Sequence, residues 1–452
     1  MPTFRHASDL PVPRQAVWDW HLRPGALVRL NPPWERARVV RSGGVAEGSE
    51  VVLQAAVAPG IETTWVMEHH DVTAPERFRD RMRRGPFARW EHLHAFEALS
   101  AGRTRLVDEI DFTPPLGPAG ALAAPSITAR LRRMFAYRHA TLAADLEAHA
   151  AAGGRTLHIA ITGASGLIGR QLEAFLTTGG HRVTRLVRGT PRPGEVRWDP
   201  AGDWDAAPLD GVDAVVHLAG EGIAAGRWTE ERKRRIRESR ARGTRSLVTA
   251  LARRPHPPRT FISASAVGIY GDRGDEPLTE AAPPGTDFLA TVGREWEAAA
   301  APIAAAGARV VQLRFGVVLS PAGGALAKML PAFRAGVAGR LGSGHQRFPW
   351  IALDDALYLI HAALLDDRYT GALNATAPDT PTNAEFTATL GRVLRRPTLL
   401  PVPAVALKLL FGEMAEATIL AGQRVVPERL TALGFRWRYP ALEGALRHAL
   451  GR

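Results

Sequence analysis

The eight residues from Thr162 to Gly169 constrain the fold of this chain more than any other stretch, because three glycines recur in them at every third position. An apolar run, Leu157 to Ile161, precedes them and predicts a buried strand, and residues 170–178 predict a helix that ends at Gly179. Glycines with this spacing permit a tight turn, a close approach of backbone to a pyrophosphate, and close helix packing. The stretch therefore predicts a dinucleotide site at a helix N-terminus rather than an ordinary turn.

The residues predicted to hold the dinucleotide lie in this turn and at the ends of neighbouring strands. The segment His217 to Gly220 ends one such strand, and its small residues let the backbone pass a cofactor. His217 itself is expected to be a satisfied core histidine. The predicted cofactor-binding residues are Thr162, Gly163, Ser165, Gly166, Leu167, Ile168, Gly169, Arg185, Arg188, Leu218, Ala219, Gly220 and Ser263.

The end of the second strand distinguishes the two nicotinamide dinucleotides. In NAD sites an acidic residue there binds the ribose hydroxyls. The strand predicted at Arg182–Val187 is followed by no carboxylate until Glu195. Arg188 lies about 20 residues after the last glycine, where the discriminating residue is expected. A guanidinium suits a 2′-phosphate, so the sequence favours NADP(H) over NAD(H), with a surface arginine as the alternative.

Length and composition limit the other classes of function. A chain of 452 residues, 46% hydrophobic and 23% charged, is expected to form two or three globular domains. It has no cysteine, which excludes disulfides, thiolate metal sites and thiol nucleophiles. The net charge of +12 comes almost entirely from arginine, and no motif indicates nucleic-acid binding.

No membrane span is predicted, because no apolar segment is long enough to cross a bilayer. The N-terminus lacks a signal-peptide pattern, so a cytoplasmic protein is expected. A small-molecule substrate is the expected partner, and the sequence leaves the oligomeric state open.

Residues 1–150 form the first predicted domain. A short helix is expected at residues 12–20, and one long helix from Ile127 to Ala150. Pro114 to Pro125 is expected to be a loop. Strands followed by a long helix indicate an α+β domain whose helix covers a curved sheet; the strands are predicted at residues 51–57, 63–69, 87–96 and 104–112.

Two histidines of this domain, His92 and His94, share one face of a predicted strand. A metal site would need a third ligand, and none is identified for this pair. They are therefore expected to be packing or surface residues, and no metal site is predicted.

From Thr156 onward strands alternate with helices, after a flexible linker. This alternation predicts a doubly wound parallel α/β sheet of the Rossmann type over residues 155–378. Residues 379–452 are expected to form a helical cap over the carboxyl ends of the strands, with a contribution from residues 316–350. The strands are predicted at Leu157–Ile161, Arg182–Val187, Ala214–Leu218, Thr260–Ser263, Arg309–Phe315 and Ala372–Ala375.

Three motifs of this second part, Thr162–Gly169, His217–Gly220 and Ser263–Gly271, together resemble the short-chain dehydrogenase/reductase superfamily, in its extended branch of sugar-nucleotide epimerases and dehydratases. A further set of motifs is found at Arg314–Ser320, Gly323–Leu326, Gln346 and Trp350–Ile351. Together they resemble a narrower "epimerase family" subgroup, some of whose members carry a START-like domain in front. The resemblance implies a cofactor-dependent oxidoreductase or epimerase.

The first domain resembles the START-like helix-grip family, also called SRPBCC. In that family the gap between helix and sheet often holds an apolar ligand, which implies one here; a filled structural core is the alternative. The resemblance is carried by Val17–His21, Asn31–Glu35, Gly85–Phe87 and Phe135–His139.

The catalytic pair of the parent family is missing. The family uses a Tyr-x-x-x-Lys pair, in which the ammonium makes the tyrosine a useful acid or base. No tyrosine stands four residues before any of the three lysines, Lys233, Lys328 and Lys408. In the helix that should carry the pair, Leu289 and Gly293 hold the two positions.

The resemblance leaves Ser265, a strand-end serine, and Tyr270, with Arg240 where the family usually has asparagine. One hypothesis is that Ser265 and Tyr270 donate to a substrate oxygen while Arg240 or Arg314 lowers the tyrosine pKa or holds an anionic substrate. Arg314 and Gln346 are the predicted substrate-binding residues. The other hypothesis is that the serine and tyrosine are strand-end and turn residues beside a bound cofactor.

Three functions stay open. The first is NADP(H)-dependent redox chemistry or epimerisation of a small carbonyl or hydroxyl compound. The second is a dinucleotide-dependent scaffold or sensor without catalysis, which the missing pair favours. The third is an apolar-ligand carrier that works through the first domain.

Overall fold

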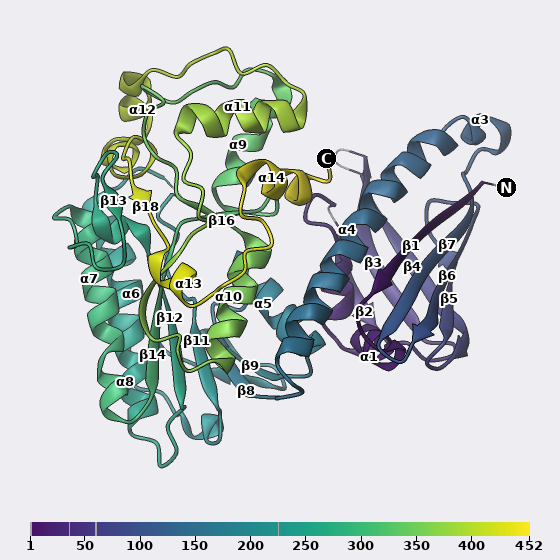
Figure 1. Ribbon diagram of the computed structural model, residues 1–452, viewed down its shortest axis with the longest axis horizontal. Coiled ribbons are helices and arrows are strands. Elements are labelled where there is room, and N and C mark those ends of the chain that lie inside the picture. Colours follow the sequence, from purple (N-terminus) through teal and green to yellow (C-terminus); the bar gives the residue numbers. More distant parts are fainter. Residues whose placement is uncertain (1, 36, 59–60, 225) are drawn as a thin grey trace. The chain divides into compact units, whose positions relative to one another are not determined.

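The computed structural model describes residues 2–35, 37–58, 61–224 and 226–452 (Figure 1). Contacts divide the chain into two compact units, one made chiefly of residues 1–156 and the other chiefly of residues 157–450. Of the helices in the described part of the chain, none combines the length and apolar character needed to traverse a bilayer.

The first unit is a seven-stranded antiparallel sheet in the order β1-β7-β6-β5-β4-β3-β2. The long helix α4 (Ala124–Ala151) lies along this sheet, and its Leu131, Phe135 and Leu142 join the core (Figure 1). This helix-grip arrangement confirms the predicted α+β class. The strands are β1 (Thr3–Leu10), β2 (Ala37–Ser42), β3 (Glu50–Ala58), β4 (Ile61–Thr73), β5 (Arg77–Arg84), β6 (Arg89–Ser100) and β7 (Arg103–Thr113), and the shorter helices are α1 (Arg14–Leu22), α2 (Ala26–Leu30) and α3 (Gly117–Ala121).

Strands β1, β2 and β5 were not predicted. In β5, arginines alternate with Phe78, Asp80 and Met82, so the charges hide the period-two pattern of an inward face. The predicted loop from Pro114 to Pro125 is wrong in part, because it contains α3 and the first residues of α4.

The second unit is built on a parallel sheet in the order β10-β9-β8-β11-β12-β14-β17. The chain runs outward from β8 to β10 and then returns to the centre at β11, which puts a topological switch point between β8 and β11. This confirms the predicted Rossmann-type sheet. Its strands are β8 (His158–Thr162), β9 (Arg182–Val187), β10 (Glu195–Arg197), β11 (Ala214–His217), β12 (Thr260–Ala266), β14 (Arg309–Phe315) and β17 (Gly371–Ala375).

Helices cover both faces of this sheet (Figure 1). On one face α6 and α8 pack Leu247, Leu251 and Ile303 against strand residues such as Val215 and Phe261. Helix α6 begins where Thr229 accepts a hydrogen bond from the backbone N–H of Arg232, an N-cap. The helices are α5 (Leu167–Thr178), α6 (Glu230–Ala252), α7 (Phe288–Ala300), α8 (Pro302–Ala305) and α10 (Leu353–Leu365), with 3₁₀ turns at Ala207–Leu209 and Val267–Tyr270.

One apolar cluster joins residues of the segment 317–352 to residues 377–450. Leu326, Phe333, Trp350, Phe386 and Leu446 belong to it, and all are buried. Within these segments β15 (Val317–Leu319) pairs with β16 (Trp350–Ala352), and β18 (Arg424–Val425) pairs with β13 (Pro277–Leu278) from outside them; both pairs are parallel. The helices are α9 (Gly324–Ala335), α11 (Asn383–Leu394), α12 (Ala404–Phe411), α13 (Glu428–Ala432) and α14 (Leu442–Leu450), with a π turn at Ala415–Ile419.

A buried ion pair ties α2 to α4 in the first unit. Arg29 donates from Nε and Nη2 to the two carboxylate oxygens of Asp145, each at 2.8 Å. Both side chains are almost fully buried, with exposed fractions of 1% and 0%. Because burial makes each charge depend on the other, the pair is costly to break from one side.

We therefore expect Asp145→Asn to lower the free energy of unfolding by about 3–5 kcal/mol, since it leaves the Arg29 guanidinium buried without its carboxylate. Calorimetric unfolding of the full chain would measure this. The control is Asp9→Asn, which removes an exposed pair with Arg105 on the same unit and should have a much smaller effect. Equal effects for the two variants would contradict the role assigned to the buried pair.

Candidate functional site

The glycine-rich turn after β8 can be built only with glycine at two of its positions. Gly163 has φ of +69°, and a Cβ there would lie 2.9 Å from the carbonyl carbon of Leu218. A Cβ at Gly169 would lie 2.3 Å from the carbonyl oxygen of Gly163. The first contact lets the turn approach the end of β11, and the second lets α5 pack against the turn.

The turn leaves the start of α5 accessible. Ser165 and Gly166 are exposed, and α5 begins at Leu167. The first N–H groups of a helix have no partner inside it and carry its positive dipole end. The turn therefore presents backbone donors suited to an anion at the carboxyl edge of the sheet.

The switch point between β8 and β11 is held together by Thr162. This residue pairs with His217 in the sheet register, and its hydroxyl oxygen accepts from the backbone N–H groups of Leu218 (3.1 Å) and Ala219 (3.2 Å). Thr162 thus fixes the backbone after β11 against the end of β8. Leu218 and Ala219 are half-buried and Gly220 is exposed, so the chain becomes accessible to solvent just beyond β11.

His217 is a core residue, as the sequence predicts. Its Nδ1 lies 2.7 Å from the Thr162 hydroxyl and its Nε2 lies 2.9 Å from the Thr244 hydroxyl. Burial lowers the pKa of His217 to about 3, so the ring is neutral. It carries no charge for catalysis.

The two arginines predicted at the end of β9 differ in their surroundings. Arg185 lies 2.9 Å from a carboxylate oxygen of Glu173 and 3.4 Å from one of Glu195. Arg188 follows the end of β9 and is exposed. Arg185 has its charge balanced within the fold, which leaves Arg188 as the candidate for an anionic group of a ligand.

Ser265, Arg314 and Asn374 stand in one row across the sheet, because Ser265 pairs with Arg314 and Arg314 pairs with Asn374. The row lies at the carboxyl ends of β12, β14 and β17. Residues in register on neighbouring parallel strands point to the same face, so the register brings their side chains together. This is the edge at which doubly wound sheets bind ligands.

A buried hydrogen-bonded network is built on this row. The Ser265 hydroxyl donates to Glu297 Oε1 at 2.7 Å, and Arg314 donates to both Glu297 oxygens at 2.8 and 2.9 Å. Arg314 Nη1 also donates to the Tyr270 hydroxyl at 2.8 Å, and that hydroxyl donates to Asn374 Oδ1 at 2.6 Å. The structure therefore brings together three of the residues that the sequence singled out: Ser265, Tyr270 and Arg314.

The predicted lowering of the tyrosine pKa by a cation is wrong in its net direction. Tyr270 is fully buried, and burial raises the pKa of its hydroxyl above the usual value although Arg314 opposes this. Arg314 donates to Glu297, to Tyr270 and to the backbone oxygen of Glu280, so its guanidinium serves the fold. Tyr270 is consequently a neutral, internally bonded side chain.

Two members of this network, Glu297 on α7 and Asn374 on β17, were not predicted as site residues. Glu297 lies in the helix that was expected to carry the Tyr-x-x-x-Lys pair, which is a signal that could have drawn attention to it. Asn374 is the next-to-last residue of β17, between Leu373 and Ala375, and only the strand register shows that it lies beside Arg314.

Arg240 and Gln346 lie outside this network. Arg240 stacks over the Trp296 ring, 4.9 Å from its centroid, and donates to the backbone oxygen of Glu221 at 3.0 Å. A Cβ at Gly220 would lie 3.4 Å from its guanidinium carbon, so Arg240 stands beside the loop after β11. Gln346 donates to the backbone oxygens of Leu341 and Ile419, which links two loops of the C-terminal segment.

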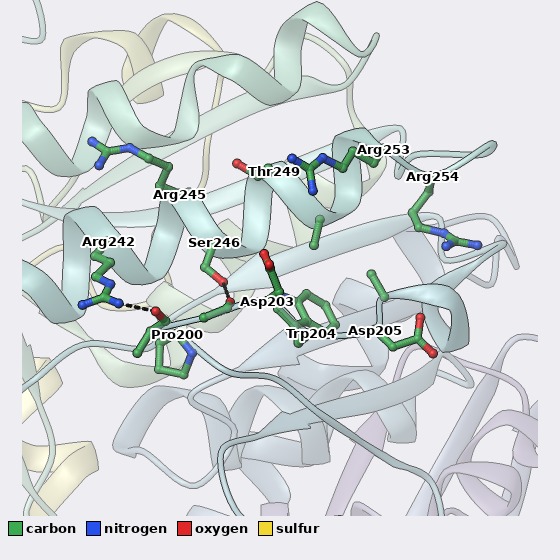
Figure 2. Close-up of a pocket in the computed structure, with 14 residues that line it drawn as sticks. Pro200, Asp203, Trp204, Asp205, Arg242, Arg245, Ser246, Thr249, Arg253 and Arg254 are labelled. Atoms are coloured by element: carbon green, nitrogen blue, oxygen red, sulfur yellow. Dashed lines mark hydrogen bonds between the residues drawn. The ribbon is translucent and has the colours of Figure 1, made fainter.

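A surface pocket of about 470 Å³ lies elsewhere, between the segment 200–206 and α6. Figure 2 shows arginines around it, among them Arg242 and Arg245 of α6 and Arg253 just after that helix. Ser246 closes one side by donating to the backbone oxygen of Asp199 at 2.8 Å. None of its lining residues belongs to the turn, to the strand-end row or to the predicted site.

Comparisons with known proteins agree with this architecture. Residues 159–374 match the family described as NAD dependent epimerase/dehydratase family, and residues 10–136 match the family described as polyketide cyclase/dehydrase and lipid transport. A domain of unknown function matches residues 402–449.

Individual relatives cover either the second part or the whole chain. The epimerase family protein Mb2239 of Mycobacterium bovis is 43% identical over 296 residues, which are 65% of this chain and 98% of that protein. The structure of human epimerase family protein SDR39U1 with NADPH is 35% identical, with a TM-score of 0.60, and covers 65% of this chain and 99% of that one.

The structure of a nucleoside-diphosphate sugar epimerase from Corynebacterium glutamicum covers 100% of this chain and 90% of its own, with 36% identity and a TM-score of 0.80. The likeness therefore includes the helix-grip domain as well as the Rossmann-type sheet. With its glycine turn, its sheet order and these relatives, the chain belongs to the epimerase family of the short-chain dehydrogenase/reductase superfamily, in the form that carries an N-terminal START-like domain.

Proposed function

We propose that this chain binds NADP(H) at the crevice between β8 and β11 and acts as an oxidoreductase or epimerase on a small carbonyl or hydroxyl compound. The observation that carries the proposal is the contact of the Gly163 backbone with Leu218 and Ala219, which sets the exposed start of α5 at the switch point. The human relative, by its name, was solved with NADPH, and the Corynebacterium relative is named a nucleoside-diphosphate sugar epimerase.

The residues of the crevice fit this cofactor. Backbone donors at the start of α5 suit a pyrophosphate. Arg188 is exposed beyond the end of β9, where a guanidinium can bind a 2′-phosphate. The small residues Ala219 and Gly220 leave the backbone beyond β11 open to a flat ring system.

A bound nicotinamide supplies hydride transfer. On this proposal the chain's own contribution centres on Ser265, whose hydroxyl donates to Glu297 at 2.7 Å and redirects that one proton to the reacting oxygen when a carbonyl compound binds. Glu297 is in turn held by two hydrogen bonds from Arg314. Tyr270 and Arg314 act as positioning residues, because both are bonded inside the protein.

A second candidate is a non-catalytic NADP(H)-dependent scaffold or sensor. The observation that favours it is Tyr270, which is fully buried with a raised pKa, in a chain without the Tyr-x-x-x-Lys pair. Such a protein would bind the cofactor by the same crevice and turn over no carbonyl compound. Catalysis therefore has to be measured separately from binding.

The cofactor preference gives the first test. We expect NADPH to bind more tightly than NADH, and Arg188→Ala to weaken NADPH binding about 10–100-fold, because a charge-assisted hydrogen bond contributes about 1.5–3 kcal/mol. Binding of NADH should change little. Titrations monitored by cofactor fluorescence would measure the dissociation constants of NADPH and NADH for the unaltered protein and for Arg188→Ala.

Arg182→Ala is the matched control, because Arg182 is an exposed arginine at the opposite end of the same strand. It should leave both affinities unchanged. A dissociation constant for NADH equal to or below that for NADPH would refute the preference.

Turnover gives the second test. We expect the protein to oxidise NADPH with at least one member of a panel of small carbonyl compounds. Ser265→Ala should lower kcat about 100-fold, the usual effect of losing one oriented donor at the reacting oxygen, with the NADPH dissociation constant unchanged. Ser265→Thr, which keeps a hydroxyl, should retain most of the rate.

The control is Ser246→Ala, which removes a hydroxyl on α6 that donates to the backbone oxygen of Asp199, outside the proposed site. It should leave turnover unchanged. Tight NADPH binding without oxidation by any carbonyl compound would support the scaffold or sensor instead.

A further inference from the structure

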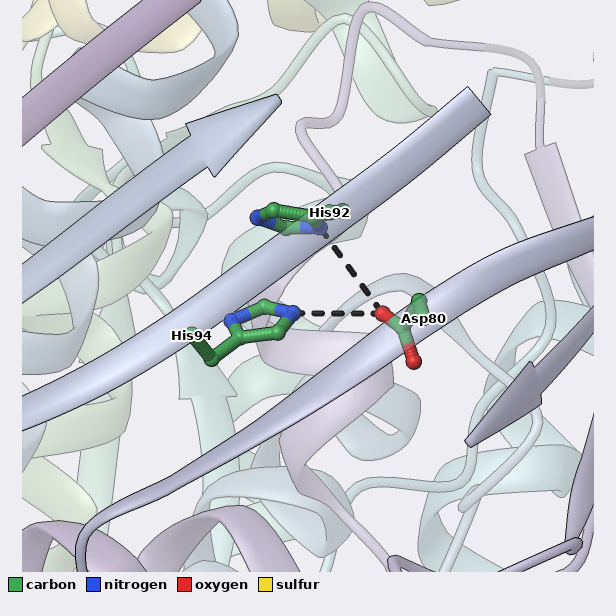
Figure 3. A group of neighbouring side chains, drawn as sticks. All are labelled: Asp80, His92 and His94. Atoms are coloured by element: carbon green, nitrogen blue, oxygen red, sulfur yellow. Dashed lines mark hydrogen bonds and ion pairs between the residues drawn. The ribbon is translucent and has the colours of Figure 1, made fainter. Parts of the chain in front are cut away.

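The interior of the first unit contains a compact group of histidines and aspartates. Asp80 of β5 and His92 and His94 of β6 face the same side of the sheet, with Asp80 and His92 paired directly in the strand register. Figure 3 shows both imidazole rings turned toward one carboxylate oxygen of Asp80. The three side chains are 16%, 6% and 10% exposed, so the group is largely removed from water.

We propose that Asp80, His92 and His94 bind a divalent transition-metal ion. The ligand atoms of the three residues all lie within 4.8 Å of one another. Asp80 Oδ2 is 3.2 Å from His94 Nε2 and 3.7 Å from His92 Nδ1. Bonds of about 2.0–2.1 Å in a tetrahedral site place neighbouring ligand atoms about 3.4 Å apart, so these separations match a site that needs little rearrangement.

A second aspartate holds both imidazoles from behind. The nitrogens that point away from Asp80, His92 Nε2 and His94 Nδ1, each lie 2.8 Å from Asp108 Oδ1. Histidines that bind a metal usually donate their other ring N–H to a carboxylate in this way. When Asp108 accepts these two protons, the nitrogens that face Asp80 present lone pairs, and lone pairs facing a carboxylate oxygen repel unless a cation lies between them.

The charge of the cluster points the same way. Within the described residues, every ion pair of Asp80 is with His69, His92 or His94, and none is with arginine or lysine. The ion pairs of Asp108 are likewise all with histidines, which are His92, His94 and His139. Two buried carboxylates need positive charge nearby; the buried Arg138 guanidinium interacts with both electrostatically, and a divalent ion between Asp80 and the two histidines would supply the rest.

The neighbouring side chains hold the carboxylates in place. His69 Nε2 lies 3.1 Å from Asp80 Oδ1, a buried oxygen that accepts no hydrogen bond. On the other side His139 Nε2 lies 2.6 Å from Asp108 Oδ2, and the ring's Nδ1 lies 2.6 Å from the Ser8 hydroxyl. The group is therefore supported from several strands and from α4.

The ligand types select the metal. Two imidazoles and one carboxylate suit Zn²⁺, Fe²⁺ and similar first-row ions, whereas Ca²⁺ and Mg²⁺ prefer oxygen ligands alone. Three protein ligands leave at least one position for water or another molecule, as in reactive sites and unlike closed structural zinc sites.

Metal binding by the intact protein is the first test. We expect the full chain, stripped with a chelator and free of any affinity tag, to bind one equivalent of Zn²⁺ in a calorimetric titration. Co²⁺ in place of Zn²⁺ should give the visible absorption of a low-symmetry nitrogen and oxygen site. Neither measurement needs a variant, so a failure of both would overturn the proposal.

Variants then assign the site. His92→Gln and His94→Gln should each lower the Zn²⁺ affinity at least 100-fold, and Asp108→Asn, a positioning variant, about 10–100-fold. The control is His70→Gln, which changes a neighbour of His69 that bonds Glu91 at 2.5 Å and lies outside the three-residue group; it should leave the affinity unchanged.

Each variant is checked for cooperative thermal unfolding before titration. Unchanged Zn²⁺ affinity in folded His92→Gln and His94→Gln would place the metal elsewhere and overturn the proposal. In that case extra protons on the histidines balance the two carboxylates.

Discussion

The second unit depends on one steric constraint, the approach of the Gly163 backbone to the end of β11. Any side chain at this position would enter the space of Leu218 and Ala219, and the left-handed conformation of Gly163 is itself unfavourable for other residues. Because the contact is backbone against backbone, it cannot be relieved by a change of rotamer. The turn, the start of α5 and the loop after β11 are therefore placed together, and they define the crevice at which a doubly wound sheet binds its ligand.

The second determinant of the site is electrostatic. Arg314 and Glu297 form a bidentate pair whose side chains are 11% and 13% exposed, and Ser265 and Tyr270 are bonded to the two members of that pair. A buried pair of this kind orders its neighbours because each unmade hydrogen bond would leave a buried charge poorly compensated. In related enzymes of the superfamily a lysine acts on a tyrosine; here an arginine is neutralised by a glutamate. The positive charge near Tyr270 is thus neutralised by Glu297. This explains why burial rather than the cation decides the direction in which the pKa of that tyrosine moves.

What the sequence could predict follows from the range of each interaction. The turn after β8 and the position of Arg188 could be predicted from neighbouring residues alone, because the glycine spacing, the apolar strand and the helix are contiguous in the sequence. The network around Ser265 could be predicted only in part, since Asn374 meets it through the register of β14 and β17 and Glu297 reaches it from α7. The histidine cluster was missed for the same reason. The carboxylates that accompany His92 come from neighbouring strands, and one of those strands, β5, was hidden by its arginines.

The Glu297–Arg314 pair and the histidine–aspartate cluster differ in how their negative charge is met. In the second unit the Glu297 carboxylate is matched by the guanidinium of Arg314, which remains charged at any physiological pH. In the first unit two carboxylates are surrounded by imidazoles, each of which is neutral unless it takes up a proton. A guanidinium completes its site by itself, whereas imidazoles complete theirs only with protons or a metal ion. Because of this difference in side-chain chemistry, the histidine–aspartate cluster of the first unit is a candidate for binding a metal ion, whereas the Glu297–Arg314 pair of the second unit needs none for its own stability.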